Sequence, residues 1–407
     1  MRNLIFFSFF SIVFSLYPEE YRIPAESGKI EKEKLARFFE EISSGQIFND
    51  KKTEQALKRS NVLSFRSTDT EKALRTILSG KNLNPVLGKA SMDYIYSRYT
   101  DSFQEEVKRL LSEEKDIRLK LIYSLYLEKG NPEYEILTRK LLEEEFAENH
   151  PYRQGYFLWK KNSVQDAYPD PENLLSSPFI PGNWILFSLQ RKDSLYPGIL
   201  IIRKPDGKFL KEENGAYFHI SHLASSASGL PFFITNGNTP KGIYFFQDTA
   251  VSENPDIGPV PALRLYMPGE ISPADFFGNR RMKKKWNYRM IKNILPPSLQ
   301  NTGDFRENYI AGAAGRSGIW SHGTAVDSEF FRDLGSYPLI PALGCFTSAE
   351  RWSEKTGKLL YSSHLTLLKT MKKHKINKGY LIAAVLNSKE KPVTLEEILP
   401  ALSLTEE

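Results

Sequence analysis

A change in the spacing of apolar residues constrains the fold of this chain more than any other feature. Between about residues 28 and 160, apolar residues recur at helical spacing, whereas further along they occur in short runs. Leu35, Phe39 and Ile42, for example, stand at i, i+4 and i+7, which places them on one face of a helix. The spacing predicts an all-α module over residues 18–165.

The second part of the chain is predicted to be rich in β-strands. The segment from Asn162 to Pro181 is rich in Pro, Asp, Ser and Asn, a composition typical of a domain edge. Beyond it, the apolar runs Gly198–Ile202 and Gly379–Leu386 are typical of buried strands. A length of 407 residues also fits two domains better than one. We therefore expect an α+β protein in which residues 166–407 form a second, separable domain.

The N-terminus has the pattern of a targeting signal. Arg2 precedes an apolar run from Leu4 to Ser15, and a run of about 12 residues is too short for a bilayer, which needs about 20. We predict a signal peptide over residues 1–17 and a protein exported to the periplasm or cell envelope. The alternative is an uncleaved N-terminal anchor.

The chain contains one cysteine, Cys345. A single cysteine excludes an internal disulfide and any site built from several cysteines, such as a zinc ribbon or an iron–sulfur cluster. Oxidising compartments favour the pairing of thiols, so an unpaired thiol in an exported protein is either a reactive group or a small buried apolar residue.

Three motifs in the second part can supply the chemistry that a reactive cysteine needs. Asn238–Tyr244 contains a Thr-Pro-Lys-Gly turn before a strand, and Gly318–Thr324 is an apolar strand that ends with His322. In Leu343–Phe346, a glycine precedes Cys345 and lets a substrate carbonyl approach the sulfur. A cysteine nucleophile requires a nearby base to become a thiolate, and a histidine suits that role.

In this order, the three motifs resemble the L,D-transpeptidase catalytic domain (YkuD-like) family over roughly residues 184–388. The resemblance implies a β-sandwich fold, export, and acyl transfer on peptidoglycan stem peptides, with no cofactor and no metal. It implies Cys345 as the nucleophile and His322 as the base, with the carbonyl of Gly323 orienting the imidazole. It also implies that Gly344 helps to form the oxyanion site.

Departures from the family pattern leave the reaction type open. The family usually has a histidine directly before Gly-Cys, where this chain has Leu343, and Arg or Asn two residues after the cysteine, where it has Thr347. Thr347 therefore occupies a position that binds substrate in the family. The alternatives are a hydrolytic carboxypeptidase or amidase of the same fold, a catalytically silent envelope-binding protein, and an unrelated all-β binding protein with a buried cysteine.

The long segment before the histidine motif is expected to determine specificity. Residues Gln247–Arg316 are rich in Pro and Gly and are predicted to cover the cleft. Arg280 and Arg281 begin a basic, aromatic cluster that we expect to bind the carboxylates of stem peptides or nearby anionic polymer. The alternative is a solvated loop, and nucleic acid is an unsuitable partner for an exported protein.

Two further sequence patterns bear on metal binding and on protein partners. His219 and His222 form a His-x-x-His pattern, but they stand in a predicted strand, so we expect no metal there. The predicted helical module carries charges of alternating sign, which usually lie on solvated faces. The alternative is a surface that binds an envelope protein.

Overall fold

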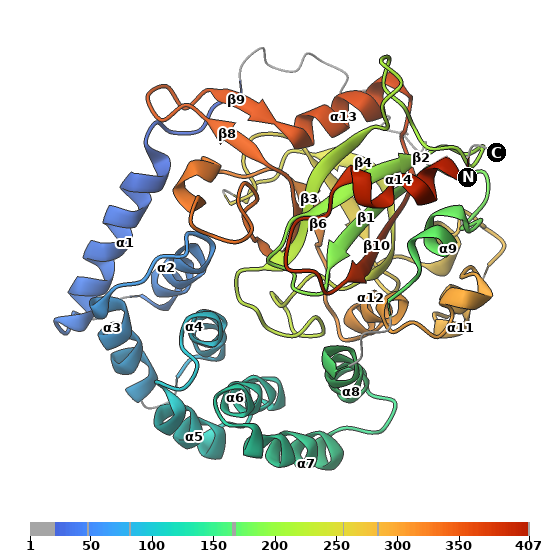
Figure 1. Cartoon of the computed structure of the whole chain (residues 1–407). Coiled ribbons are helices and arrows are strands. Elements are labelled where there is room, and N and C mark those ends of the chain that lie inside the picture. The colour runs from blue at the N-terminus through green and yellow to red at the C-terminus, as the bar shows by residue number, and fades with distance from the viewer. Residues whose placement is uncertain are drawn as a thin grey trace, which may run out of the picture.

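The computed structural model combines an array of helices with a closed β-barrel (Figure 1). It describes residues 21–46, 49–80, 83–164, 168–254, 256–282 and 285–405. The signal peptide expected at residues 1–17 lies outside these ranges. Among the helices of the described ranges, none has the length and apolar character that crossing a bilayer requires.

The N-terminal part is helical, which confirms the prediction from apolar spacing. Its helices follow one another in an arc around one side of the barrel, and we call α1–α8 the helical array (Figure 1). The bounds are α1 Ser27–Ser43, α2 Asp50–Val62, α3 Thr68–Ser79, α4 Pro85–Arg98, α5 Gln104–Glu113, α6 Ile117–Gly130, α7 Glu135–Glu145 and α8 Pro151–Val164.

Polar side chains define where several of these helices begin. The Asn84 side chain accepts a hydrogen bond from Val86 N at the start of α4, and Asp116 caps α6 in the same way by accepting from Arg118 N. Proline follows Asn84 at the first helical position, where its missing N–H is not needed. α4 and α6 lie inside the arc and are buried on most sides, so they carry apolar residues around most of their circumference.

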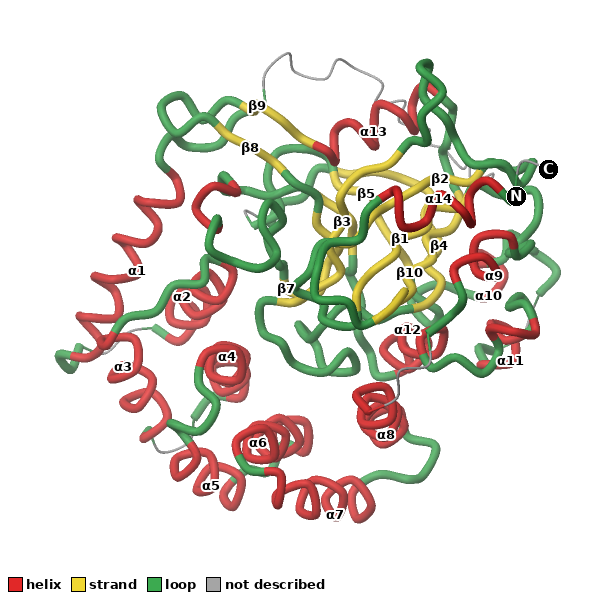
Figure 2. Tube along the Cα trace, viewed as in Figure 1, coloured by secondary structure: helices red, strands yellow, loops and turns green. Residues whose placement is uncertain are grey.

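The second part contains a barrel of eight strands, closed in the order β1-β10-β4-β5-β6-β7-β3-β2 (Figure 2). The β-sandwich expected from the resemblance is therefore wrong. The sheet closes on itself because β1 pairs with β2 on one side and with β10, in parallel, on the other. The strand bounds are β1 Ile185–Arg191, β2 Gly198–Arg203, β3 His219–Ser226, β4 Gly242–Ala250, β5 Ala262–Tyr266, β6 Trp320–His322, β7 Leu343–Thr347 and β10 Gly379–Asn387.

β1 and β2 are buried along their whole length, because the barrel interior covers one face of these strands and other elements cover the opposite face. In β1, Leu186 belongs to the cluster that fills the barrel, whereas Ile185 and Phe187 belong to a second cluster outside it. Short helices cover that outer cluster, which contains Phe276, Phe305 and other side chains of these helices. Strands covered on both sides read as continuous apolar runs rather than as alternating patterns.

The remaining elements lie around the barrel. The helices of this part are α9 Pro171–Ser176, α10 Pro273–Phe276, α11 Tyr288–Lys292, α12 Asp304–Ala313, α13 Ser363–Lys373 and α14 Leu395–Ser403. A separate two-stranded sheet consists of β8 Glu350–Trp352 and β9 Leu359–Ser362. Short 3-10 helices span Pro132–Tyr134, Pro297–Leu299 and Ser328–Phe331.

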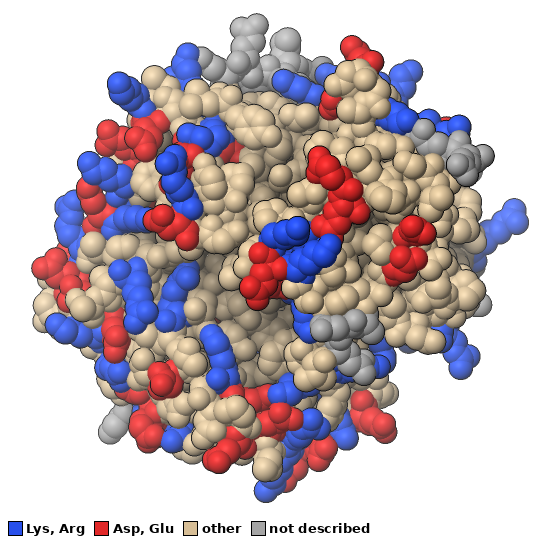
Figure 3. Space-filling model, viewed as in Figure 1, with Lys and Arg blue, Asp and Glu red and all other residues tan. Residues whose placement is uncertain are grey.

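The helical array packs directly on the barrel. Gly155 of α8 lies so close to the ring of Phe233 that a Cβ atom would be 2.6 Å from it. Asn162 Nδ2 donates to Glu307 Oε1 of α12 at 2.9 Å. Charges of both signs are interspersed on the outer surface of the array in the face shown in Figure 3. That the two parts can fold separately stays a prediction.

Candidate active site

Parallel pairing of β6 with β7 brings the histidine and cysteine motifs side by side. Ser321 stands opposite Phe346, and His322 stands opposite Thr347. Ser321 and Phe346 face the barrel interior, where both contact His222. Because side chains alternate along a strand, His322 and Cys345 point away from the barrel interior on the same face of the sheet.

Both side chains border one small cavity of about 60 Å³. A volume of this size takes only a small part of a peptide, so the rest of a substrate must lie outside it. The helical array contributes Arg59 and Val62 of α2 to the wall, and the segment before β5 contributes Asn254, Asp256 and Ile257. The remaining wall residues are His322, Gly323, Thr324, Ala325, Val326, Phe331, Ile340, Pro341, Ala342, Leu343, Cys345 and Thr347.

His322 is held by the residue that follows it. Its Nδ1 lies 2.6 Å from the carbonyl oxygen of Gly323, the contact that the resemblance implies. A carbonyl can only accept, so Nδ1 carries the proton and Nε2 is the basic nitrogen. Burial lowers the pKa of His322 to about 4, and the imidazole is therefore neutral at physiological pH.

Cys345 is a partly covered thiol in a desolvated setting. Trp320 N donates to its sulfur at 3.4 Å, and the sulfur lies 3.7 Å from the carbonyl oxygen of Gly318. Burial raises the pKa of the Cys345 thiol, while the Trp320 N–H and the charge of Arg316 act in the opposite direction. Cysteine and histidine are thus both neutral at rest, and a role of Cys345 as a nucleophile would require a base to remove the thiol proton first.

The turn after His322 depends on a buried carboxyl group. Glu350 of β8 packs against Gly323 so closely that a Cβ atom there would lie 2.0 Å from the carboxyl. The carboxyl accepts hydrogen bonds from Thr324 N at 2.8 Å and from Ser362 Oγ at 2.7 Å. Burial raises the pKa of Glu350 to about 8. Glycine at position 323 therefore lets this carboxyl fix the backbone that holds the imidazole.

Gly344 allows close packing behind Cys345. Its φ is +100°, a conformation that residues with a Cβ rarely adopt. A Cβ there would lie 2.4 Å from Arg316 Nη2 and 2.7 Å from the carbonyl oxygen of Gly237. Any larger residue would displace the backbone that leads into Cys345.

Of the substrate-binding residues predicted from the sequence, Thr347 borders the cavity of Cys345, whereas Arg280 and Arg281 do not. Thr347 borders the cavity, and its hydroxyl donates to the carbonyl oxygen of Ile340 at 2.7 Å, which ties down the loop before β7. Arg280 and Arg281 lie on the exposed turn after α10 and do not border the cavity of Cys345. Of the segment Gln247–Arg316, the part near Asp256 borders this cavity, as described above, while α10 and α11 pack on the outer cluster.

The two histidines of the His-x-x-His pattern differ in burial and in their contacts. His222 is buried in the barrel between Ser188 Oγ at 2.8 Å and Ser321 Oγ at 3.0 Å, whereas His219 is exposed. Within the described residues, no group of histidine, cysteine, aspartate and glutamate side chains is arranged to hold a metal ion.

A second cavity of about 450 Å³ lies between α8, α12 and one end of the barrel. Its buried charges have partners from the chain itself. Glu307 accepts from Lys241 N at 2.9 Å and from Asn162, and Lys241 Nζ donates to the carbonyl oxygen of Thr239 at 3.1 Å. These contacts join the helical array to the barrel.

Sequence reasoning missed three groups around this site. These are Glu350 against Gly323, the buried Arg316 against Gly344, and the ion pair between Arg59 and Asp256 at the cavity wall. The hint in the sequence is the pair of glycines, Gly323 and Gly344. A glycine permits the close approach of another residue but does not show which residue that is.

Comparisons with known proteins identify no relative of this chain, so a proposal about its function depends on the geometry of the site. No protein-family model matches the chain, no curated protein matches it, and no solved structure matches it.

Proposed function

We propose that this chain is an exported cysteine acyltransferase of the L,D-transpeptidase type that acts on peptidoglycan stem peptides. One observation carries the proposal: Cys345 and His322 project from adjacent parallel strands into the same cavity, and His322 is oriented through Nδ1 by Gly323. A nucleophile, a base and a group that orients the base are the parts that acyl transfer by a cysteine requires.

The proposed reaction begins with proton transfer. His322 Nε2 takes the proton from Cys345 Sγ, and the thiolate attacks the carbonyl carbon of an amide in the stem peptide. Backbone N–H groups at Gly344 and Cys345 would stabilise the oxyanion that forms. The imidazolium then gives its proton to the leaving amine as the C–N bond breaks, which leaves a thioester on the sulfur.

The thioester is resolved by a second nucleophile. An acceptor amine attacks the thioester carbonyl and His322 removes the amine's proton. As the C–S bond breaks, the imidazolium returns this proton to the sulfur, which restores the thiol. Water in place of the amine gives hydrolysis, so transfer and hydrolysis share every step up to the thioester. The proposal requires no cofactor or metal.

Incubation with purified muropeptides, followed by mass spectrometry, tests the proposal. We expect a cross-linked or exchanged product, or a trimmed peptide if water is the acceptor, and its loss in Cys345→Ser and His322→Gln. A carbapenem should also acylate Cys345, which intact-mass measurement detects. Absence of both turnover and acylation in folded protein would refute the proposal and favour an envelope-binding role.

A further inference from the structure

A buried arginine lies behind the candidate nucleophile. The Arg316 side chain, on the loop between α12 and β6, is 3% exposed. Its guanidinium donates to the carbonyl oxygens of Phe232, of Asn238 at 2.8 Å and of Gly237 at 3.0 Å. Among the described residues, no carboxylate forms an ion pair with it. This is unusual, because buried charges are normally paired.

The three carbonyl groups hold the cation without cancelling its charge. Burial lowers the pKa of Arg316 to about 10, so the guanidinium stays protonated at physiological pH. Nη2 occupies the space that a Cβ atom on Gly344, directly before Cys345, would need. A unit charge in a desolvated position acts on a neighbouring thiolate far more strongly than the same charge in water.

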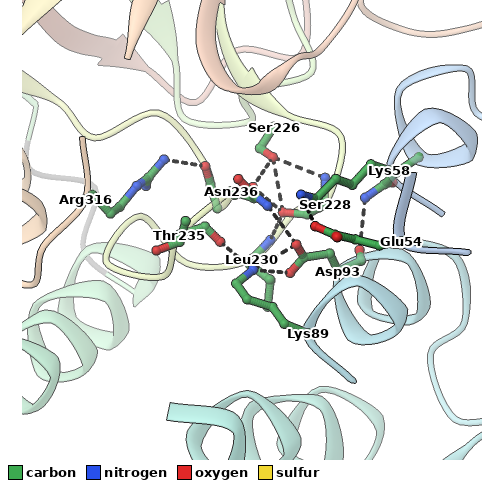
Figure 4. A network of polar contacts seen from close by, with 12 residues as sticks. Glu54, Lys58, Lys89, Asp93, Ser226, Ser228, Leu230, Thr235, Asn236 and Arg316 are labelled. Atoms are coloured by element: carbon green, nitrogen blue, oxygen red, sulfur yellow. Dashed lines mark hydrogen bonds and ion pairs between the residues drawn. The ribbon is translucent and has the colours of Figure 1, made fainter. Parts of the chain in front are cut away.

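The turn that carries these carbonyl groups is held by the helical array (Figure 4). Lys89 Nζ of α4 donates to the carbonyl oxygen of Thr235 at 2.9 Å and pairs with Asp93 at 2.7 Å. Asp93 also accepts from Asn236 Nδ2 at 2.9 Å. Asn236 has a φ of +65°, and its carbonyl oxygen accepts from Ser228 Oγ at 2.6 Å. The turn is thus fixed from both sides.

We propose that Arg316 is a positioning residue that stabilises the thiolate of Cys345 through its charge. We further propose that the helical array keeps Arg316 in place through Asp93 and Lys89. Contacts therefore run from α4 through the turn at residues 235–238 to the backbone before the nucleophile. The inference rests on Cys345 being the reactive thiol of the proposed function and does not depend on the substrate.

Several other groups bear on the charge state of Cys345. The titratable and charged groups that face it, or the backbone around it, are His322 of β6, Glu270 before α10, Tyr244 of β4, Asp256 before β5 and Arg59 of α2. Arg59 is paired with Asp256, and Glu270 accepts from Gly318 N at 2.9 Å. In the described part of the chain, Arg316 therefore differs from Arg59 in that its guanidinium has no hydrogen-bonded carboxylate.

The pH dependence of thiol alkylation in the full chain tests the inference. Iodoacetamide is uncharged, so the reaction reports the thiolate rather than attraction of the reagent; the S–C bond forms and iodide leaves. We expect Arg316→Met to move the inflection of the rate upward by about one pH unit, a tenfold loss of thiolate at pH 7. Arg316→Lys should keep the inflection close to that of the parent, because lysine keeps the positive charge.

Arg203 provides a matched control. It is also a buried arginine held by backbone carbonyl oxygens, those of Leu175 at 3.0 Å, Ser177 at 2.6 Å and Phe179 at 3.3 Å. Burial lowers its pKa to about 10 as well. Arg203→Met should therefore destabilise the fold comparably and leave the inflection of alkylation unchanged.

The contribution of the helical array is tested with Asp93→Asn. We expect its inflection to rise by about 0.3–0.5 pH unit, and that of Asp69→Asn, a half-buried aspartate on α3, to match the parent. A folded Arg316→Met variant with the parent inflection overturns the inference. If circular dichroism shows that Arg316→Met does not fold, an unchanged inflection in Asp93→Asn overturns it. Muropeptide turnover is scored separately, so the proposed function can fail while the shift in alkylation remains.

Discussion

Replacing Gly323 with alanine should damage the site through the carboxyl of Glu350. The backbone of Gly323 does not have the positive φ that disfavours alanine, so the substitution tests the close contact alone. The added Cβ would lie 2.0 Å from the carboxyl, and Glu350 is fully buried and held from two sides, so it cannot move freely. Overpacking of this kind costs about 1–3 kcal/mol.

Two measurements follow from this magnitude. With about 2.1 cal/mol/K of unfolding entropy per residue, a cooperative transition of all 407 residues should lose only about 1–4 °C in Tm. Urea denaturation should therefore accompany calorimetry. The functional effect should be larger, because movement of the Gly323 carbonyl releases Nδ1 of His322 and leaves the base misoriented; the rates of muropeptide turnover and of carbapenem acylation report this.

Two variants separate the contact from a general effect of alanine. Gly335→Ala is the matched control, since a Cβ there meets nothing within 4 Å, and it should match the parent. In a Glu350→Ala background, Gly323→Ala should cost almost nothing, because the clashing group is gone. If Gly323→Ala keeps the parent's stability and turnover, Gly323 and Glu350 do not have the role assigned to them.

Three further predictions follow. Burial lowers the pKa of His222 to about 3, below the value of about 6.5 in the unfolded chain, so its contribution to stability is complete above pH 6.5 and is lost as the pH falls toward 3. His222→Gln should flatten the fall of the unfolding free energy over that range, and an identical pH dependence in both proteins would contradict this. Residues 175–407 alone should melt cooperatively at a lower temperature than the full chain, because they lose the contacts of α8; aggregation under all conditions would count against a separable domain. Arg280→Ser with Arg281→Ser should weaken binding of stem peptides and leave alkylation of Cys345 unchanged, and binding at the parent level would reduce both arginines to solvated surface residues.

The sequence predicts the local structure of this chain well because local structure depends on nearby residues. The apolar spacing at Leu35, Phe39 and Ile42 identifies α1, and the apolar run Gly379–Leu386 identifies β10. Which strands pair is a different matter. β1 and β10 are about 190 residues apart, and their parallel pairing closes the barrel, a contact that no local pattern contains.

The site divides in the same way. Cys345, His322 and Gly323 stand in short motifs, so their types and order suffice to nominate them. Arg316 is a single arginine between small residues, and only the fold shows that it lies behind Gly344. Likewise, Arg59 and Asp256 meet across 197 positions of sequence, which is why the contribution of the helical array to the cavity wall could not be predicted.

The closed barrel restricts how a peptide substrate can be recognised. Many peptide-binding proteins hold an extended chain by adding it as a strand to a free sheet edge, where unpaired backbone groups give affinity for any sequence. All eight strands of this barrel already have neighbours on both sides. Outside the barrel, the described residues form the small β8–β9 sheet, which begins three residues after Thr347, and its β9 edge is partly paired because Leu359 N donates to the carbonyl oxygen of Tyr21 at 3.0 Å. If the proposed function is correct, a stem peptide is therefore selected by its side chains and its termini rather than by strand addition to the barrel.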